Sequence, residues 1–347
     1  MKKSLNFNVP FVGFTSTDIY SCLASVYVHL EKLAGSDDYD CEQKRGQPCN
    51  GCGNCADSTE KVLEKVYFLF DTMSGRSSLR NRYDGAKTEI DTAIDDGGGS
   101  DDTVEFLLGF AGYEYHKITL PSEFKEAIVA SIDAEKPVIA KVKDGRARFR
   151  VITGYDGNAI IEADYAGAQR KPQPTSYDEI DALYVLCAKV KPLYTLIDGL
   201  KRIRRVMEYN IAEKLWDSYT AKIGWYDNGG LADTDLDEKK ARMKRISDTM
   251  WYTFNCHNFA EVFRYCYYEE LTDPAVRDLW YPIGPTYGYT HDLAWALIDI
   301  ENQIDWTKLM YTPGMGEMVQ LTLYKIREHD AKVLEIIKGA IDILEPK

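Results

Sequence analysis

The chain has 347 residues, of which 45% are hydrophobic and 28% are charged, a composition typical of folded globular proteins and unlike that of disordered or fibrous ones. Its 42 basic and 55 acidic residues give a net charge of −13, which disfavours nucleic acid as a partner because phosphate binding needs clustered Lys and Arg. No apolar run is long enough to cross a bilayer and no continuous apolar segment follows Lys2 and Lys3. We therefore expect a cytoplasmic protein that has no signal peptide and does not bind a membrane.

The first half of the chain is predicted to contain helices followed by a meander of strands. In chain order, the predicted elements are helices over 18–33, 58–70 and 103–110, a strand over 113–118, a helix over 124–132, and strands over 137–142, 149–155, 159–164 and 183–190. The polar stretch from Arg76 to Asp102 predicts a long loop, and loops of this length often act as lids. Helices followed by neighbouring strands predict an α+β domain over residues 1–190.

The second half, residues 191–347, is predicted to be an all-α helical bundle, with the boundary at Lys191-Pro192. Apolar residues recur at helical spacing near 196–207, 259–266, 293–300 and 318–344. The basic run from Lys201 to Arg205 is interpreted as a solvated helix face or as a partner in intramolecular salt bridges. Many of the 24 tyrosines lie in this half, where they either pack the bundle or line a ligand pocket.

Cys22 lies at the start of the first predicted helix and is the first candidate for chemistry. Ser21 and Asp18, one and four positions earlier, are both good N-cap residues. A thiol at this position is close to the positive end of the helix dipole, which favours the thiolate that a nucleophilic cysteine needs. Free cysteine is also among the most buried residue types, so a packed structural thiol is the alternative interpretation.

A strand motif and the order of the elements point to a known family. Residues 148–156 read Arg-Phe-Arg-Val-Ile-Thr-Gly-Tyr-Asp, and residues 160–164 read Ile-Ile-Glu-Ala-Asp. Over roughly residues 10–190 the chain resembles the bacteriocin-processing branch of the papain-like cysteine peptidases, whose histidine strand often reads His-Phe-x-Val-x-Thr-Gly-Tyr-Asp. The helical second half resembles that of butirosin-type acyltransferase homologues. The resemblance implies a papain-like α+β domain followed by a helical bundle.

The resemblance also assigns site residues. Cys22 falls on the position of the nucleophile and Asp164 on that of the acid that orients the base. Arg148 stands where the family has its catalytic histidine, and Ser16 and Thr17 stand where its oxyanion-hole glutamine is expected. A guanidinium stays protonated over the useful pH range and therefore cannot take a proton from a thiol. It can instead bind a carboxylate or a phosphate.

Two functions follow, and the sequence leaves open whether the protein is an enzyme. The first is a non-catalytic or divergent member of the family that binds a small anionic or peptide ligand through Arg148, Arg150 and Tyr155. The alternative is a cysteine-dependent acyl or amide hydrolase or acyltransferase that uses Cys22. That enzyme would need a base from elsewhere, and His257 or His291, each close to a predicted helix start, is the candidate.

Four cysteines form a second candidate site within an insertion over residues 41–55. They are Cys41, Cys49, Cys52 and Cys55. Thiolates separated by two residues that include glycine can both turn toward one metal, so we predict a structural zinc site. An iron–sulfur cluster and free or redox-active thiols are the alternatives. The chain contains no recognised nucleotide-cofactor motif.

A third feature is the segment from Phe70 to Ser78, which reads Phe-Asp-Thr-Met-Ser-Gly-Arg-Ser-Ser. Backbone N–H groups and the Arg76 guanidinium in such a segment can bind an anion. The simpler interpretation is the capped end of a helix.

Overall fold

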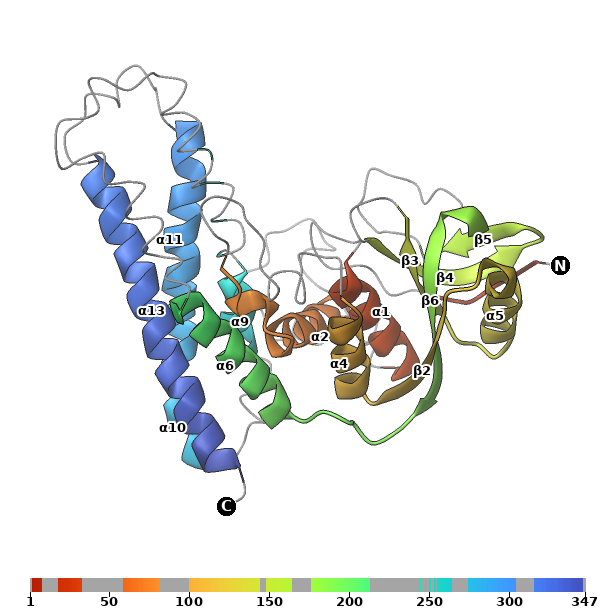
Figure 1. The fold of residues 1–347 in the computed structure, drawn as a ribbon, viewed down its shortest axis with the longest axis horizontal. Coiled ribbons are helices and arrows are strands. Elements are labelled where there is room, and N and C mark those ends of the chain that lie inside the picture. Colours follow the sequence, from red (N-terminus) through yellow and green to blue (C-terminus); the bar gives the residue numbers. More distant parts are fainter. Residues whose placement is uncertain are drawn as a thin grey trace, which may run out of the picture. The chain divides into compact units, whose positions relative to one another are not determined.

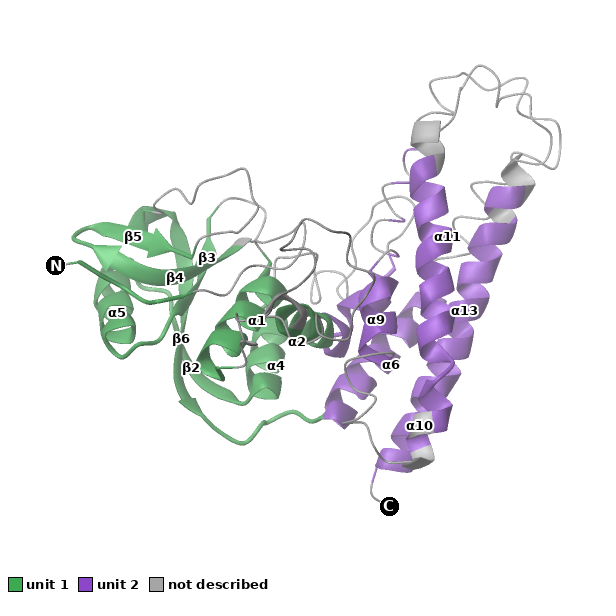
Figure 2. Ribbon diagram, turned by 180° about the vertical axis from the view of Figure 1, so that it is seen from behind, with its two compact units in different colours: residues 1–70, 95–195 green, residues 71–94, 196–347 purple. Residues whose placement is uncertain are grey.

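The computed structural model describes a mixed α+β protein (Figure 1). The described residues are 2–7, 18–32, 59–80, 100–143, 148–163, 176–212, 244, 247, 250, 253, 255–263, 274–303 and 315–345. The chain divides into two compact units: residues 1–70 and 95–195 form unit 1, and residues 71–94 and 196–347 form unit 2 (Figure 2). The second junction, after Thr195, lies near the boundary expected from sequence, but unit 2 also takes the segment 71–94 from the first half.

A six-stranded antiparallel sheet forms the centre of unit 1 (Figure 1). Its strands are β1 (Lys2–Ser4), β2 (Tyr113–Ile118), β3 (Val138–Val142), β4 (Arg148–Asp156), β5 (Ala159–Glu162) and β6 (Ile180–Lys189). Their order is β1-β4-β3-β6-β2, and β5 pairs with β4. The five strands predicted from alternation are confirmed. β1 was not predicted, because three residues are too few to show a period of two.

The register of the sheet gives it two apolar faces. Val138 of β3 pairs with Ile152 of β4 and with Val185 of β6. β4 turns into β5 at Gly157, which has a φ of +62° as the predicted hairpin turn requires.

Four of the described helices belong wholly or partly to unit 1. They are α1 (Ile19–Leu30), α2 (Thr59–Met73), α4 (Asp101–Ala111) and α5 (Pro121–Asp133). α5 packs on β4 and β6, and its Phe124, Ile128 and Ile132 join a buried apolar cluster with residues of these strands. α1 packs on β4 and α4 packs on β2. A short 3-10 helix, η3 (Tyr177–Glu179), leads into β6.

Local sequence explains where α4 begins and ends. Ser100 caps its N-terminus by accepting a hydrogen bond from the N–H of Thr103 (3.2 Å), and Asp101 and Asp102 occupy its first turn, where the helix dipole favours acidic groups. Gly112 ends α4 in the left-handed conformation, with a φ of +74°. The N–H of Val190 then donates to the carbonyl of Gly112 (2.9 Å), which ties the end of β6 to the end of α4.

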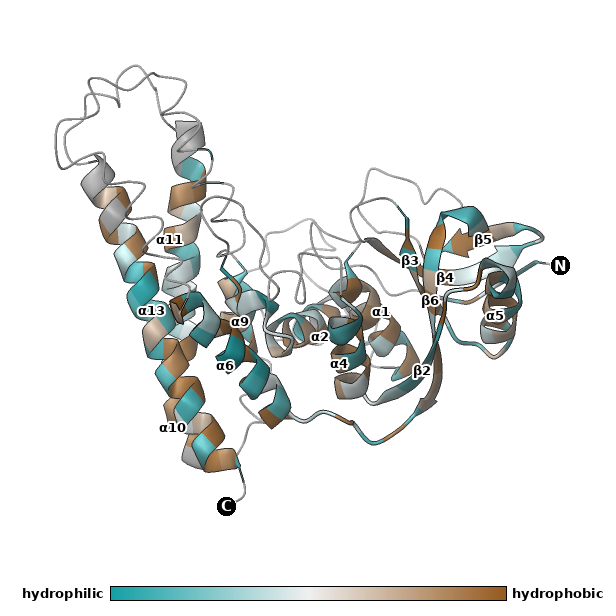
Figure 3. Cartoon of the chain, viewed as in Figure 1, coloured by the Kyte–Doolittle hydropathy of each residue, from teal (hydrophilic) through white to brown (hydrophobic). Residues whose placement is uncertain are grey.

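The regular elements in the described part of unit 2 are all helices, as predicted for the second half of the chain. Its elements are η2 (Arg76–Ser78), α6 (Leu196–Ala212), α9 (Cys256–Glu261), α10 (Pro274–Trp280), α11 (Ile283–Gln303) and α13 (Met315–Leu344). α13 packs on α6, α10 and α11, and α11 also packs on α9. Hydrophobic and hydrophilic residues alternate along α13, as expected of a helix with one buried face (Figure 3). None of the helices in the described part of the chain has an apolar stretch long enough to cross a membrane.

Two left-handed glycines of unit 1 allow a matched test of the packing between α4 and β6. A Cβ at Gly112 would lie 2.7 Å from the carbonyl oxygen of Val190, whereas a Cβ at Gly157 would meet no atom within 4 Å. We expect Gly157→Ala to cost about 1 kcal/mol from backbone strain alone. We expect Gly112→Ala to cost about 1–3 kcal/mol more because of the clash. Hydrogen exchange of the β3 and β4 amides across a urea series measures both. Equal losses would contradict the close approach at Gly112.

Candidate functional site

Cys22 lies in the first turn of α1, as the sequence predicts, and the cap of this helix is well defined. Asp18 is the N-cap residue, and its Oδ1 accepts hydrogen bonds from the N–H (2.7 Å) and the Oγ (2.6 Å) of Ser21. The Cys22 side chain is 0% exposed. Cys22 is therefore both at the start of a helix and completely buried.

The environment of Cys22 favours the thiol. Burial raises the pKa of the thiol well above its ordinary value, the carboxylates of Asp18 and Glu162 raise it further, and the charge of Arg150 lowers it. The direction of this shift opposes the thiolate expected from the helix N-terminus and agrees with the alternative interpretation, a packed thiol. The dipole of a helix end is worth at most about 2 kcal/mol, which is less than the cost of holding an unpaired anion away from water.

Arg150 and Glu162 form an ion pair, and both of their charges act on the pKa of Cys22. Arg150 lies on β4 and Glu162 ends β5, with 3.5 Å between Arg150 Nε and Glu162 Oε2. Glu162 is 7% exposed, and among the described residues its Oε1 has no hydrogen-bond partner. Burial raises the pKa of Glu162 to about 7, Arg150 opposes this rise, and the nearby Glu179 adds to it. Near neutral pH this carboxyl is therefore only partly charged.

Of the other predicted site residues, the structure describes the side chain of Tyr155 but not those of Arg148 and Asp164. Arg148 is the first residue of β4 and pairs with Val142, but its side chain lies outside the described part of the chain. Asp164 also lies outside it. Tyr155 is 4% exposed in the apolar cluster under α5, and its hydroxyl donates to Asp133 Oδ1 (3.0 Å). The structure therefore gives Tyr155 a packing role and brings Cys22 together with Arg150.

Glu162 was not selected from the sequence, although it stands within the strand that carries the family resemblance. It is two positions before Asp164, and an acidic residue near the end of a buried strand was the available signal. What the sequence could not show is that the pairing of β5 with β4 places Glu162 opposite Ile152 and beside Arg150.

The histidines considered as catalytic bases are not among the groups that act electrostatically on Cys22. Within the described residues, the charged groups that act on the Cys22 pKa are Asp18, Arg150 and Glu162, and none of them is an imidazole. His257 and His291, the candidates from the second half, lie near each other inside unit 2, with ring centroids 4.8 Å apart and ring planes tilted by 44°.

The predicted zinc ligands Cys41, Cys49, Cys52 and Cys55 lie outside the described residues. The part of the chain that is described contains no cluster of three or more His, Cys, Asp or Glu side chains arranged to hold a metal. The zinc site therefore stays a prediction.

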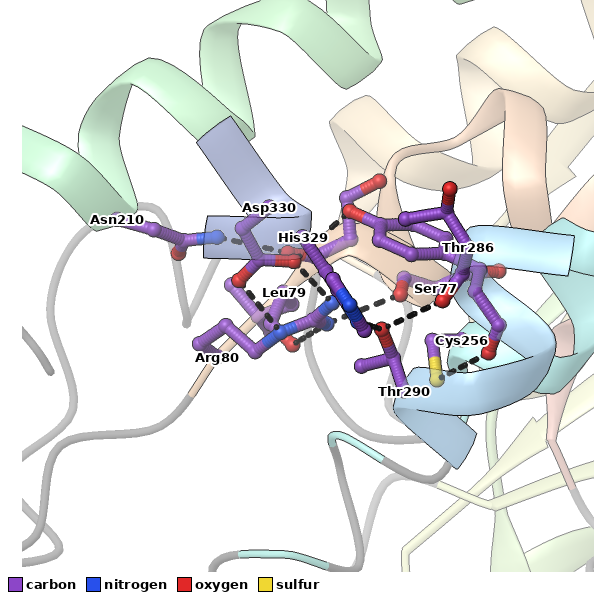
Figure 4. A network of polar contacts seen from close by, with 11 residues as sticks. Ser77, Leu79, Arg80, Asn210, Cys256, Thr286, Thr290, His329 and Asp330 are labelled. Atoms are coloured by element: carbon purple, nitrogen blue, oxygen red, sulfur yellow. Dashed lines mark hydrogen bonds and ion pairs between the residues drawn. The ribbon is translucent and has the colours of Figure 1, made fainter. Parts of the chain in front are cut away.

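A second polar cluster, inside unit 2, was not predicted. Arg80 is 1% exposed and forms a two-point contact with Asp330 of α13, from Nε to Oδ2 (3.2 Å) and from Nη2 to Oδ1 (2.9 Å) (Figure 4). The Tyr287 hydroxyl also donates to Asp330 Oδ1 (2.9 Å). Arg80 Nη1 donates to the carbonyls of Ser77 and Leu79. The guanidinium and the carboxylate thus compensate each other in the core of unit 2.

The segment from Asp71 to Ser77 is part of the same polar core. Asp71 Oδ2 accepts hydrogen bonds from Ser77 Oγ (2.5 Å) and Asn258 Nδ2 (2.9 Å), and Arg76 Nη1 lies 3.1 Å from Asp71 Oδ1. Ser74 Oγ donates to the carbonyl of Asp71 at the end of α2 (2.8 Å). The capped helix end is thus confirmed. The loop expected from Arg76 onward is wrong for Arg76 to Arg80, which are buried.

The basic run on α6 makes intramolecular contacts, as one of its two interpretations expected. Lys201 pairs with Glu345 (2.5 Å), and Arg204 pairs with Glu208 (3.0 Å). Arg202 Nε donates to the carbonyl of Ser74 (3.1 Å).

Comparison with known proteins does not assign a family. No protein-family model matches the chain, and no curated protein matches it. The function must therefore be argued from the residues of the two clusters themselves.

Removal of one charge tests the buried pair of unit 2. We expect Asp330→Asn to destabilise unit 2 by about 3–5 kcal/mol, because it leaves the buried Arg80 without its counter-charge. All six tryptophans belong to unit 2, so their fluorescence reports urea unfolding of this unit alone. Asp342→Asn, at an exposed position of the same helix, is the matched control. A loss no greater than that of the control would contradict the pairing.

The pH dependence of stability tests the state of Glu162. Its pKa is about 7 in the folded protein and about 4.3 in an unfolded chain. A raised pKa gives stability that is fully present below the unfolded pKa and is lost as the pH rises through the folded pKa. Compared with Glu162→Gln, which does not titrate, the native protein should lose about 3 kcal/mol between about pH 4 and about pH 8. Hydrogen exchange of unit 1, compared between the two proteins at each pH, measures this. A stability difference between the two proteins that stays constant over this pH range would show that the pKa of Glu162 is not raised.

Proposed function

We propose that unit 1 is a papain-like domain that does not perform hydrolysis and that binds a small anionic ligand, or the carboxylate of a peptide, beside Cys22. The observation that carries this proposal is the complete burial of the Cys22 thiol among groups that keep it protonated. A nucleophilic cysteine needs the thiolate and a base in reach. Near Cys22 the described charged groups are two carboxylates and a guanidinium.

The helix and strand arrangement supports the family part of the proposal. The helix that begins next to Cys22 packs on β4, the strand that carries the motif resembling the family's histidine strand. The first residue of that strand is Arg148, where the family has histidine. An arginine cannot act as a general base, but it recognises carboxylates and phosphates through two parallel hydrogen bonds.

Arg150 and Glu162 explain why the bound group would be an anion. The Arg150 side chain is 20% exposed, so the guanidinium reaches solvent while Glu162 is buried. Because the pKa of Glu162 is raised to about 7, this carboxyl neutralises Arg150 only in part near neutral pH. The remaining positive charge favours an anionic ligand. Binding of an anion would in turn favour the protonated form of Glu162, so affinity should rise as the pH falls through about 7.

The alternative function is a cysteine-dependent acyl or amide hydrolase or acyltransferase. The family resemblance of the Cys22 helix favours it. It requires that the thiol become exposed and lose its proton during turnover. It also requires a general base, and none of the charged groups that act on Cys22 is a histidine. The buried thiol therefore favours binding over this alternative.

Alkylation by iodoacetamide over a range of pH, with the modified peptides identified by mass spectrometry, distinguishes the two functions. We expect Cys22 to stay unmodified in the folded protein up to about pH 8.5, the ordinary pKa of a free thiol, and to react fully in denaturant. Cys187, which is half-buried, serves as the internal reference. Alkylation of Cys22 with an apparent pKa below the ordinary value would support the hydrolase and contradict the binding function.

Calorimetry with N-acetylglycine as a probe carboxylate tests the binding part. We expect Arg150→Gln to weaken binding about tenfold, which corresponds to the loss of one charged hydrogen-bonded contact. Lys143→Gln, an exposed cation of the same sheet, should bind as the native protein does. No binding by the native protein, or equal binding by the two variants, would reject Arg150 as a ligand-binding residue.

A further inference from the structure

β2 forms one end of the sheet of unit 1. The strand order ends with β2, and within the described residues β2 pairs only with β6. An edge strand presents N–H and C=O groups along its free side, which can pair with another extended chain. This edge is separate from the Cys22 site, so the following inference stands independently of the proposed function.

A groove of about 670 Å³ is lined by residues of β2, of α4, and of the end of β6 and the segment that follows it. Tyr113 and Tyr115 of β2 and Gly109 of α4 line it, and Leu193, which is 68% exposed, lies at its end beyond β6. The hydrogen bond from the N–H of Leu193 to the carbonyl of Gly109 (2.9 Å) fixes that end of the groove. The groove thus combines a strand edge with aromatic and aliphatic contacts.

Acidic side chains lie on both sides of this edge. On the side of α4, Lys117 bonds Asp101, and Glu105 acts electrostatically on Tyr115. Residues of a strand alternate between its faces, so Glu114 and His116 belong to the opposite face, where Ile118 packs on the cluster under α5. Glu105 and Glu114 are exposed in the groove, and neither forms an ion pair with any described Lys or Arg.

The charges identify what can bind at this edge. The acidic side chains oppose a second copy of this chain, whose net charge is −13, because pairing β2 with its own copy would bring like charges together. An extended segment with alternating side chains would place a basic residue near Glu105 on one face and another near Glu114 on the other. Lys191, at the end of the groove, limits the acidic region to the part beside α4 and β2.

We propose that the free edge of β2 binds an extended, lysine- or arginine-containing segment of a partner protein by strand addition. The main chain of the segment would pair with β2, Glu105 and Glu114 would contact its basic side chains, and Tyr115 would pack against their aliphatic parts. This gives the chain a peptide-binding surface in addition to the anion site beside Cys22.

Fluorescence anisotropy with a labelled short peptide that alternates lysine and valine tests this proposal on the full chain. We expect the peptide to bind and its glutamate analogue not to bind. N-methylation of alternate peptide nitrogens should abolish binding when it removes the N–H groups that face β2, and should leave it unchanged when the other nitrogens are methylated. This comparison changes only the ligand and therefore does not depend on whether a protein variant folds.

A double variant tests the role of the two carboxylates. We expect Glu105→Gln with Glu114→Gln to weaken binding about fivefold to tenfold, because the double variant removes two exposed ion pairs with the peptide. The matched control is Glu123→Gln with Glu126→Gln, two exposed positions of α5, which should bind as the native protein does. Absence of binding to the lysine peptide would overturn the proposal. Equal affinity for both N-methylated forms, or equal weakening by the two double variants, would also overturn it.

Discussion

The cost of removing charge from water is the constraint on which both units depend, and the two units meet it in different ways. In unit 1 the buried groups respond by changing protonation: burial raises the pKa of Cys22 and raises that of Glu162 to about 7. In unit 2 burial likewise raises the pKa of the Cys256 thiol, but Arg80 and Asp330 stay charged and pair at two points, and the Tyr287 hydroxyl also donates a hydrogen bond to Asp330. The first solution leaves groups that respond to pH and to ligands. The second is a fixed part of the core of unit 2.

The buried pair of unit 2 also explains how the chain is divided. Arg80 and Asp330 are 250 positions apart, so the core of unit 2 needs a segment from the first half of the chain as well as the C-terminal helix α13. The same segment places Asp71 against Asn258 of α9. A fragment that starts at the predicted boundary would retain Asp330 but lack its counter-charge. The interval 71–94 is therefore a structural component of unit 2, although it is inserted in the sequence of unit 1.

Most of the regular elements could be predicted from the sequence, because the spacing of apolar residues records which face of a helix or strand is buried. The start of α1 at its Asp18 cap and the turn at Gly157 follow from local chemistry in the same way. The site was less predictable, since the protonation of Cys22 depends mainly on its burial, which is set by the packing of distant segments. Arg80 was missed for the same reason. A single arginine in a polar stretch is typical of a surface loop, and only its distant partner makes burial possible.

The proposed binding function requires that Cys22 be a buried, protonated thiol. Infrared difference spectroscopy of the native protein and a Cys22→Ala variant at about pH 8 tests it most directly, because subtraction cancels the other seven thiols. At that pH an activated catalytic cysteine is largely thiolate, whereas a buried one retains its proton. We expect an S–H stretching band from Cys22 in the native protein that shifts when Arg150 is replaced by glutamine. No S–H band, together with thiolate absorbance that is lost in the variant, would contradict it and restore the cysteine-dependent hydrolase.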